Sequence, residues 1–263
     1  MSEVIVVTSG KGGVGKTTTT ANLGAGLAAL GHKVVLVDAD IGLRNLDVVL
    51  GLENRIVYDI TDVTEGNCRL RQALIKDKRY DGLYLLPAAQ TKDKTAVNPD
   101  QMRKLCADLA EEFEYVVIDC PAGIEQGFRN AIAGAQKAIV VTTPEVAAVR
   151  DADRVIGLLE AAELRNPALI INRIRPKMVR HGDMMGIEDI IDILAVDLLG
   201  VVPEDEMVVI STNRGETVVS DERSRSGQAF RNIVRRIKGE AVPMMNLDDS
   251  GFLNRLRRII GIR

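Results

Sequence analysis

Residues 10–17 read GKGGVGKT, and this stretch decides the fold. It fits the pattern G-x-x-x-x-G-K-[ST] of a phosphate-binding loop. The apolar, β-branched run of residues 3–8 has the length of a buried strand, and residues 17–30 predict a helix that ends at Gly31. Glycines between a strand and a helix let backbone N–H groups and the helix N-terminus point at an anion. A glycine-rich turn that binds nothing is the alternative.

Three side chains of the loop carry chemistry of their own. Lys16 is placed to reach the β- and γ-phosphates of a nucleotide, and the hydroxyl of Thr17 is placed to ligate Mg²⁺. Lys11 follows the first glycine and has no task at a single nucleotide, because Lys16 already supplies the cation. A solvated loop lysine is therefore the plain interpretation of Lys11.

Composition limits the architecture and the partners. The chain has 263 residues, which fits one large α/β domain or two small ones. Its residues are 46% hydrophobic but only 3% aromatic, so the core must be aliphatic and suits parallel strands covered on both faces. The net charge of −3 gives no overall signature of nucleic-acid binding.

The cysteines and the apolar runs predict a reduced, cytosolic protein. Cys68, Cys106 and Cys120 form no C-x-x-C pair, which also argues against an iron–sulfur cluster on that motif. We expect no signal peptide, and no apolar run reaches the length that spans a bilayer.

Carboxylates follow two of the predicted strands. Residues 33–38 predict a strand that ends in Asp38, with Asp40 two residues later, and residues 115–119 predict a strand that ends in Asp119. Ligands of open α/β sheets bind at this edge. Asp38 and Asp119 are therefore candidate Mg²⁺ partners, and Asp40 is a candidate to orient or deprotonate water. Capping of the loops by these aspartates is the alternative.

Strands and helices alternate along the rest of the chain, which predicts a doubly wound, mostly parallel α/β sheet with helices on both faces. We expect one domain over residues 1–238. Further strands are expected at 82–87, 138–142, 168–173 and 198–203, and further helices at 58–63, 70–75, 98–113, 143–162, 186–195 and 226–238.

The C-terminal segment stands apart in charge. Residues 239–250 are expected to form a linker, and residues 251–263 an amphipathic helix, because apolar side chains recur at i, i+1, i+4, i+7 and i+8. Four arginines and no acid give this tail a charge of +4, so the rest of the chain carries −7. A basic amphipathic helix is typical of a membrane-surface element or a partner helix. The alternative is a helix folded back on its own core. The predicted membrane residues are Phe252, Leu253, Arg255, Leu256, Arg257, Arg258, Ile259 and Ile260.

With its additional lysine, GKGGVGKT resembles the loop of the deviant Walker A (ParA/MinD) ATPases. The stretches VDADIGLRNLD, QALIKDKR, VIDCPAGIE, TTPEVAAVRDADR and the tail extend the likeness to the MinD branch over nearly the whole chain. The resemblance implies a P-loop NTPase fold, ATP and Mg²⁺ as cofactors, and an ATP-bound homodimer in which Lys11 reaches the partner's phosphates. It also implies hydrolysis that uses Lys11, Lys16 and Asp40.

The same resemblance implies where the base and the partners bind. Asn172, Arg173 and the loop Pro203–Asp205 are similar to the family's adenine pocket, and no N-K-x-D motif for guanine is present. The tail would hold the protein on anionic lipid at the cytoplasmic face of the inner membrane. A MinC-like division inhibitor would bind the helix that carries Arg150, Asp151 and Asp153. MinE or another topological factor would stimulate hydrolysis. The predicted nucleotide-binding residues are Gly10, Lys11, Gly12, Gly13, Val14, Gly15, Lys16, Thr17, Thr18, Gly123, Asn172, Arg173, Pro203 and Asp205, and the predicted metal-binding residues are Thr17, Asp38 and Asp119.

Two other functions remain open on the sequence alone. A ParA-like DNA-partitioning ATPase would need basic surface, and the net charge of the chain disfavours it. A nucleotide-gated carrier or scaffold, for example in flagellar placement, is the third possibility. Pelleting with anionic liposomes or with DNA, each with and without ATP, separates the three.

Overall fold

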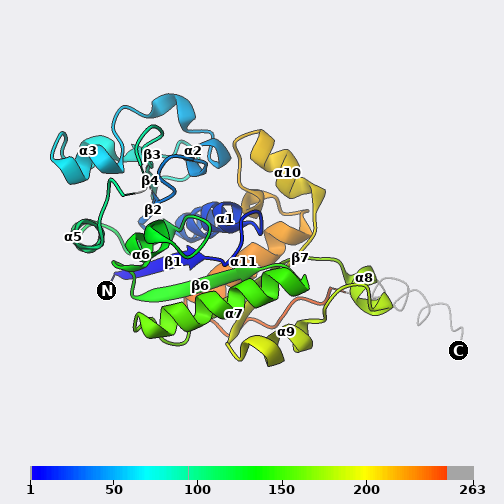
Figure 1. The fold of residues 1–263 in the computed structure, drawn as a ribbon. Coiled ribbons are helices and arrows are strands. Elements are labelled where there is room, and N and C mark those ends of the chain that lie inside the picture. Colours follow the sequence, from blue (N-terminus) through cyan, green and yellow to red (C-terminus); the bar gives the residue numbers. More distant parts are fainter. Residues whose placement is uncertain (1, 94, 248–263) are drawn as a thin grey trace, which may run out of the picture.

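The computed structural model describes residues 2–93 and 95–247. The predicted tail, residues 251–263, and the last three residues of the predicted linker lie outside the described residues. Figure 1 shows the described chain as a sheet with helices packed around it. Among the described residues, no helix is both long enough and apolar enough to cross a membrane.

Within the described ranges, eight strands form a single sheet in the order β3-β4-β2-β5-β1-β6-β7-β8. Every neighbouring pair is parallel except β3 and β4, which are antiparallel at the edge. The doubly wound, mostly parallel sheet predicted from the sequence is confirmed. The strands are β1 (Glu3–Thr8), β2 (Val34–Asp38), β3 (Ile75–Lys76), β4 (Leu83–Leu86), β5 (Tyr115–Asp119), β6 (Lys137–Thr142), β7 (Ala168–Ile174) and β8 (Leu198–Pro203).

Each helix predicted within residues 1–238 is found, one of them with a corrected end, but the helices at residues 46–49, 126–132, 176–181 and 206–213 were not predicted. The helix expected over residues 70–75 ends at Ala73, because Ile75 pairs with Leu85 of β4 and the chain becomes the edge strand β3. The helices are α1 (Lys16–Ala29), α2 (Leu46–Val49), α3 (Ile60–Glu65), α4 (Leu70–Ala73), α5 (Pro99–Ala110), α6 (Gln126–Ile132), α7 (Val146–Ala161), α8 (Pro176–His181), α9 (Ile187–Leu194), α10 (Glu206–Asn213) and α11 (Arg225–Ile237), and the short 3-10 helices are η1 (Glu53–Arg55) and η2 (Val218–Ser220).

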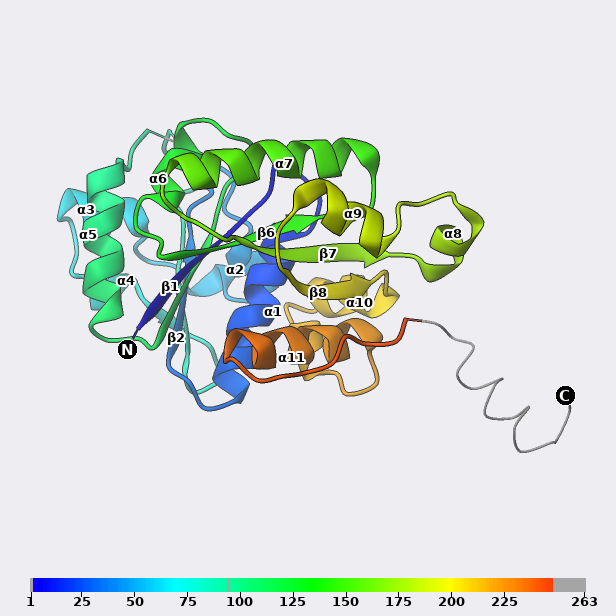
Figure 2. The same ribbon diagram turned by 90° about the horizontal axis from the view of Figure 1, so that it is seen from below.

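Helices cover both faces of the sheet. Figure 2 shows α6 and α7 on one side of the strands and α1 and α11 on the other. In the described chain each face has its own aliphatic core: Val6, Val116 and Leu159 belong to one cluster, and Ile5, Leu36 and Phe230 to the other. Because residues of one strand alternate between faces, β1 contributes Val6 to the first core and Ile5 to the second.

The sheet brings the strand ends that carry chemistry together. β5 lies between β2 and β1, so Asp38 at the end of β2 is the register partner of Asp119 at the end of β5. Val7 of β1 is the register partner of Asp119 on the other side. The phosphate-binding loop follows β1 directly, so the loop and both carboxylates share one edge of the sheet.

Candidate functional site

The phosphate-binding loop has the backbone geometry that only glycine adopts easily. Gly13 and Gly15 have positive φ angles of 82° and 98°, and Gly15 is the N-cap of α1. The loop is also tightly enclosed. A Cβ atom on Gly10 would lie 2.1 Å from the carbonyl oxygen of Asp151 in α7, and one on Gly15 would lie 2.3 Å from Nδ2 of Asn172 in β7. The loop is therefore held between two elements from the second half of the chain.

The two lysines of the loop differ in environment. Lys16 is the first residue of α1 and is only 8% exposed, whereas Lys11 is exposed to solvent. Lys16 therefore lies at the helix N-terminus with the backbone N–H groups that bind anions. The exposed position of Lys11 leaves its side chain accessible to a second molecule.

The carboxylates of Asp38 and Asp119 are buried beside the loop. Asp38 accepts hydrogen bonds from the backbone N–H groups of Asp40, at 2.9 Å, and of Leu46, at 3.2 Å. Asp119 accepts a hydrogen bond from the hydroxyl of Thr20 at 3.3 Å. Thr17 and Thr20 both lie on the first turns of α1, so this helix carries hydroxyl groups to the carboxylate.

Burial raises the pKa of Asp38, and the nearby charge of Asp119 raises it further. Burial also raises the pKa of Asp119, although the hydroxyl of Thr17 and the charge of Lys16 oppose that shift. A carboxylate pair of this kind is costly to ionise without a cation. These donors fit Mg²⁺, which nucleotide sites bind through one or two carboxylates and phosphate oxygens. No group of three or more His, Cys, Asp or Glu side chains that could hold a metal ion is found in the described part of the chain.

Asp40 and Gly123 lie at the same edge. The charge of Asp40 contributes to the raised pKa values of both Asp38 and Asp119, so its carboxylate is close to both. Gly123 follows β5 and has a positive φ of 93°, with open space where a Cβ atom would stand. Their roles toward a water molecule and a γ-phosphate stay predictions.

The sequence suggested that β7 ends at Asn172 and Arg173. In the structure the strand continues to Ile174, so Asn172 lies inside it. Its Nδ2 donates a hydrogen bond to the carbonyl of Val14 at 2.8 Å, and its Oδ1 accepts one from the backbone N–H of Arg173 at 3.0 Å. The side chain thus supports the phosphate-binding loop directly. Arg173 is exposed and has a positive φ of 58°. Contact of either side chain with a base stays a prediction.

The carboxylate of Asp205 is used within the protein. It accepts hydrogen bonds from the N–H of Met207 at 2.9 Å, the hydroxyl of Ser224 at 2.7 Å and the N–H of Ser226 at 3.1 Å. The carbonyl of Pro203 accepts one from the hydroxyl of Ser226 at 2.9 Å. Asp205 therefore caps α10 and contacts the start of α11, and its contact with a base stays a prediction.

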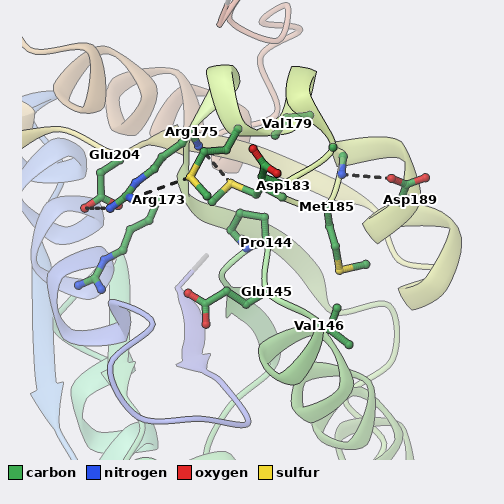
Figure 3. A pocket seen from close by; sticks show the side chains of 14 residues that line it. Pro144, Glu145, Val146, Arg173, Arg175, Val179, Asp183, Met185, Asp189 and Glu204 are labelled. Carbon is green, nitrogen blue, oxygen red and sulfur yellow. Dashed lines mark hydrogen bonds and ion pairs between the residues drawn. The ribbon is translucent and has the colours of Figure 1, made fainter.

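A groove of about 770 Å³ is lined by Arg173, one of the predicted base-binding residues, and by Glu204 of the loop Pro203–Asp205. Figure 3 shows Arg173, Arg175 and Glu204 on one side of it and Pro144 and Glu145 on another. Nη2 of Arg175 lies 3.8 Å from Oε1 of Glu204. The groove therefore continues from the ends of β6, β7 and β8 toward α8 and α9.

The predicted partner residues lie in the first half of α7. Arg150 and Asp153 are exposed, and Asp151 is partly buried. The backbone of Asp151 lies against Gly10, so this helix surface is directly connected to the phosphate-binding loop.

Sequence reasoning missed some of the residues that shape the site. Thr20 was not singled out, although the run of four threonines at 17–20 gives a second hydroxyl one turn after Thr17. The backbone N–H of Leu46, which holds Asp38, had no side-chain signal.

Residues 5–218 match the family described as the CobQ/CobB/MinD/ParA nucleotide binding domain. Over all of both chains, the protein is 58% identical to the septum site-determining protein MinD of Bacillus subtilis. Over 98% of both chains, it is 58% identical to that of Synechocystis.

Solved structures point to the same family as the sequence relatives. The MinC:MinD cell division protein complex of Aquifex aeolicus contains a chain that matches 93% of this protein and is itself 99% covered, with 51% identity and a TM-score of 0.87. The MinD of Pyrococcus horikoshii complexed with Mg-ADP matches 90% of this protein and is 96% covered, with 32% identity and a TM-score of 0.83. The phosphate-binding loop, the paired strand-end carboxylates and these likenesses agree, and the chain belongs to the MinD branch of the CobQ/CobB/MinD/ParA nucleotide-binding family.

Proposed function

We propose that the protein is an ATP-hydrolysing switch that places the division septum. The observation that carries this proposal is the shared edge of the sheet, where the loop at 10–17 meets the buried carboxylates of Asp38 and Asp119. An anion-binding loop beside carboxylates that favour a cation is the arrangement for a nucleotide with Mg²⁺. ATP is the expected nucleotide, as the family resemblance implies.

Each side chain then has a role that its position supports. Lys16 would neutralise the β- and γ-phosphates, and Thr17, Asp38 and Asp119 would hold Mg²⁺. The bound ion would supply charge compensation for the leaving phosphate oxygen. Asp40 would orient the attacking water, a contribution of roughly 10²–10⁴-fold for a positioned acid or base.

Lys11 links hydrolysis to association with a second copy of the chain. Its exposed side chain leaves the loop free to contact a partner's phosphates, so we propose that the ATP-bound form is a homodimer. In the dimer each protomer would complete the site of the other. ATP would then control every function that needs two copies.

The dimer is proposed to act at the membrane and to recruit a division inhibitor. Residues 1–238 would form the ATPase domain, 239–250 a linker and 251–263 the membrane helix, at the cytoplasmic face of the inner membrane. The MinC:MinD complex of the Aquifex relative supports a MinC-like partner. That partner would bind α7 at Arg150, Asp151 and Asp153, and MinE or another topological factor would release the protein. DNA is not an expected partner.

Two lysine variants test the switch. Lys16→Ala should weaken ATP binding itself, whereas Lys11→Ala should keep much of the binding and lose ATP-dependent dimers and hydrolysis. Light scattering with ATP and with ADP measures the dimer, and phosphate release measures turnover. Normal dimers of Lys11→Ala would show that this lysine is only a solvated loop residue.

A further inference from the structure

A turn between β3 and β4 contains an ion pair between a buried carboxylate and a partly exposed guanidinium. The side chain of Asp77 is 0% exposed, and that of Arg79 is 34% exposed. The carboxylate of Asp77 accepts hydrogen bonds from the backbone N–H groups of Arg79, at 2.6 Å, and Tyr80, at 3.2 Å. It also accepts one from Nη2 of Arg79 at 3.0 Å. The carboxylate therefore fixes the guanidinium in one orientation.

The guanidinium uses its other donors to join two helix ends. Nη2 donates to the carbonyl of Leu50, the C-cap of α2, at 2.6 Å, and Nη1 donates to the carbonyl of Gly215, just after α10. The two ends are in contact here, because a Cβ atom on Gly215 would lie 2.6 Å from Cα of Gly51. Figure 1 shows α2 and α10 as neighbours, and the two helices are in contact.

The first of these helices leads to the metal side of the candidate site. α2 is a single turn in which the N–H of Leu50 donates to the carbonyl of Leu46 at 3.2 Å. The N–H of Leu46 in turn donates to the carboxylate of Asp38, also at 3.2 Å. Arg79 is thus separated from Asp38 by one helical turn.

The second helix leads to the base side. α10 begins at its N-cap Asp205, whose carboxylate accepts from the N–H of Met207, and the loop Pro203–Asp205 precedes it. At its other end the N–H of Gly215 donates to the carbonyl of Thr212 at 2.9 Å. Arg79 therefore holds the C-terminal ends of two helices, one of which begins beside Asp38 and the other at the loop Pro203–Asp205, where the base is predicted to bind.

We propose that Asp77 and Arg79 form a positioning pair that couples the metal side of the nucleotide site to its base side. This inference rests on the proposed function, since it assigns the pair to the same nucleotide and Mg²⁺. The planar fork of arginine suits one carboxylate and two carbonyls at once, and a lysine offers only a point charge. Without Arg79, the carboxylate of Asp77 stays buried without its cation and the carbonyls of Leu50 and Gly215 lose their donor.

Hydrogen exchange of the nucleotide-free protein tests the coupling without any activity. In Arg79→Ala, exchange should accelerate together over residues 46–52 and 207–216, and Arg79→Lys should give an intermediate result. The matched control is Arg55→Ala, because Nη1 of Arg55 also donates to a backbone carbonyl, that of Lys76 at 2.7 Å, but joins no second helix. Acceleration confined to residues 77–80, or spread evenly over the chain, would overturn the proposal.

Binding of ADP with and without Mg²⁺ tests the consequence for the site. Calorimetry well below the melting temperature should show that Arg79→Ala reduces the gain in ADP affinity from Mg²⁺ by roughly two- to thirtyfold, the usual range for a coupling residue away from both ligands. A lower melting temperature with an unchanged Mg²⁺ gain would reduce the pair to a structural contact. A wild-type protein that binds no ADP would instead contradict the proposed function, while the exchange result would still decide the coupling.

Discussion

At the scale of single residues, the glycines of the phosphate-binding loop differ in how closely they pack against the rest of the protein. Gly10 lies against the backbone of Asp151, whereas a Cβ atom on Gly12 would meet only the Cβ of Ala122 at an ordinary 3.7 Å. Gly10 is therefore needed for packing between the loop and α7, and Gly12 is free of that constraint.

We expect Gly10→Ala to lower the free energy of unfolding by about 1–3 kcal/mol, because the backbone of α7 must move to admit one methyl group. Gly12→Ala should stay within about 1 kcal/mol of wild type, since the lost backbone freedom of the unfolded chain favours the variant slightly. Urea unfolding without nucleotide measures both. Equal stability of the two variants would show that the loop yields without cost.

The site residues that could be predicted from the sequence are those whose position follows from the strand in which they lie. Asp38 and Asp119 end parallel strands, so their meeting at one edge follows from the strands themselves. The hydrogen bond from Asn172 to Val14 joins residues 158 positions apart, and that from Arg79 to Gly215 joins residues 136 apart. No local sequence pattern reports such pairs, so the support that Asn172 gives to the phosphate-binding loop was not predicted and Arg79 was not singled out.

At the scale of elements, the caps decide where helices begin. At the start of α5 the amide oxygen of Asn98 accepts a hydrogen bond from the N–H of Gln101 at 2.9 Å, and Pro99 is the first helical residue. Asp205 does more, because its carboxylate caps α10 and also contacts Ser226 at the start of α11. The sequence marks Asp205 as the end of a strand and loop, and only the fold shows that two helices share it.

Asp205 should make stability depend on acid. Burial tends to raise its pKa, but hydrogen bonds from Ser224, Met207 and Ser226 outweigh that effect and the pKa is lowered. In the unfolded chain the pKa of an aspartate is about 3.9. The stabilisation by the ionised Asp205 carboxylate is therefore complete above that pH, and it is lost as the pH falls through the lower pKa of the folded state.

We therefore expect Asp205→Asn to have a lower melting temperature than wild type at neutral pH. The difference between the two melting temperatures should become smaller near pH 3. Thermal unfolding across that range measures it. The control is Asp100→Asn on α5, whose carboxylate is 92% exposed and should change little. If the difference in melting temperature is the same at neutral and acid pH, the charge of Asp205 has no role. The loss would then mean only that the asparagine amide replaces the hydrogen bonds of the carboxylate in part.

At the scale of the whole molecule, the doubly wound, mostly parallel sheet followed from the alternation of strands and helices along the chain. The edge strand β3 did not, because two residues pair too briefly to show a period of their own. The helix predicted over residues 70–75 is confirmed as far as Ala73 and is wrong at Ile75, where pairing with β4 overrides a weak helical preference. Short edge elements depend on their neighbours more than on their own residues.

In the proposed function, the tail would connect the nucleotide to the membrane only through the dimer. Each arginine adds about 1 kcal/mol at an anionic surface, and each partly buried apolar side chain adds about 1 kcal/mol. Ordering a helix of this length costs much of that gain, so one tail should bind weakly. Two tails on one dimer gain roughly 10²–10⁴-fold, because the second contact is intramolecular.

Leu256→Glu should therefore abolish pelleting with anionic liposomes in ATP while ATP binding stays intact. The substitution puts a charge in the middle of the apolar stripe and lowers the tail charge from +4 to +3. In wild type, ATP should give strong pelleting and ADP weak pelleting, and added salt should weaken binding only in part, because screening affects the arginines and not the apolar contacts. Equal pelleting with both nucleotides would contradict dimer gating. Undiminished pelleting of Leu256→Glu would place the stripe against another surface, and ATP-dependent pelleting with DNA alone would favour a partitioning ATPase.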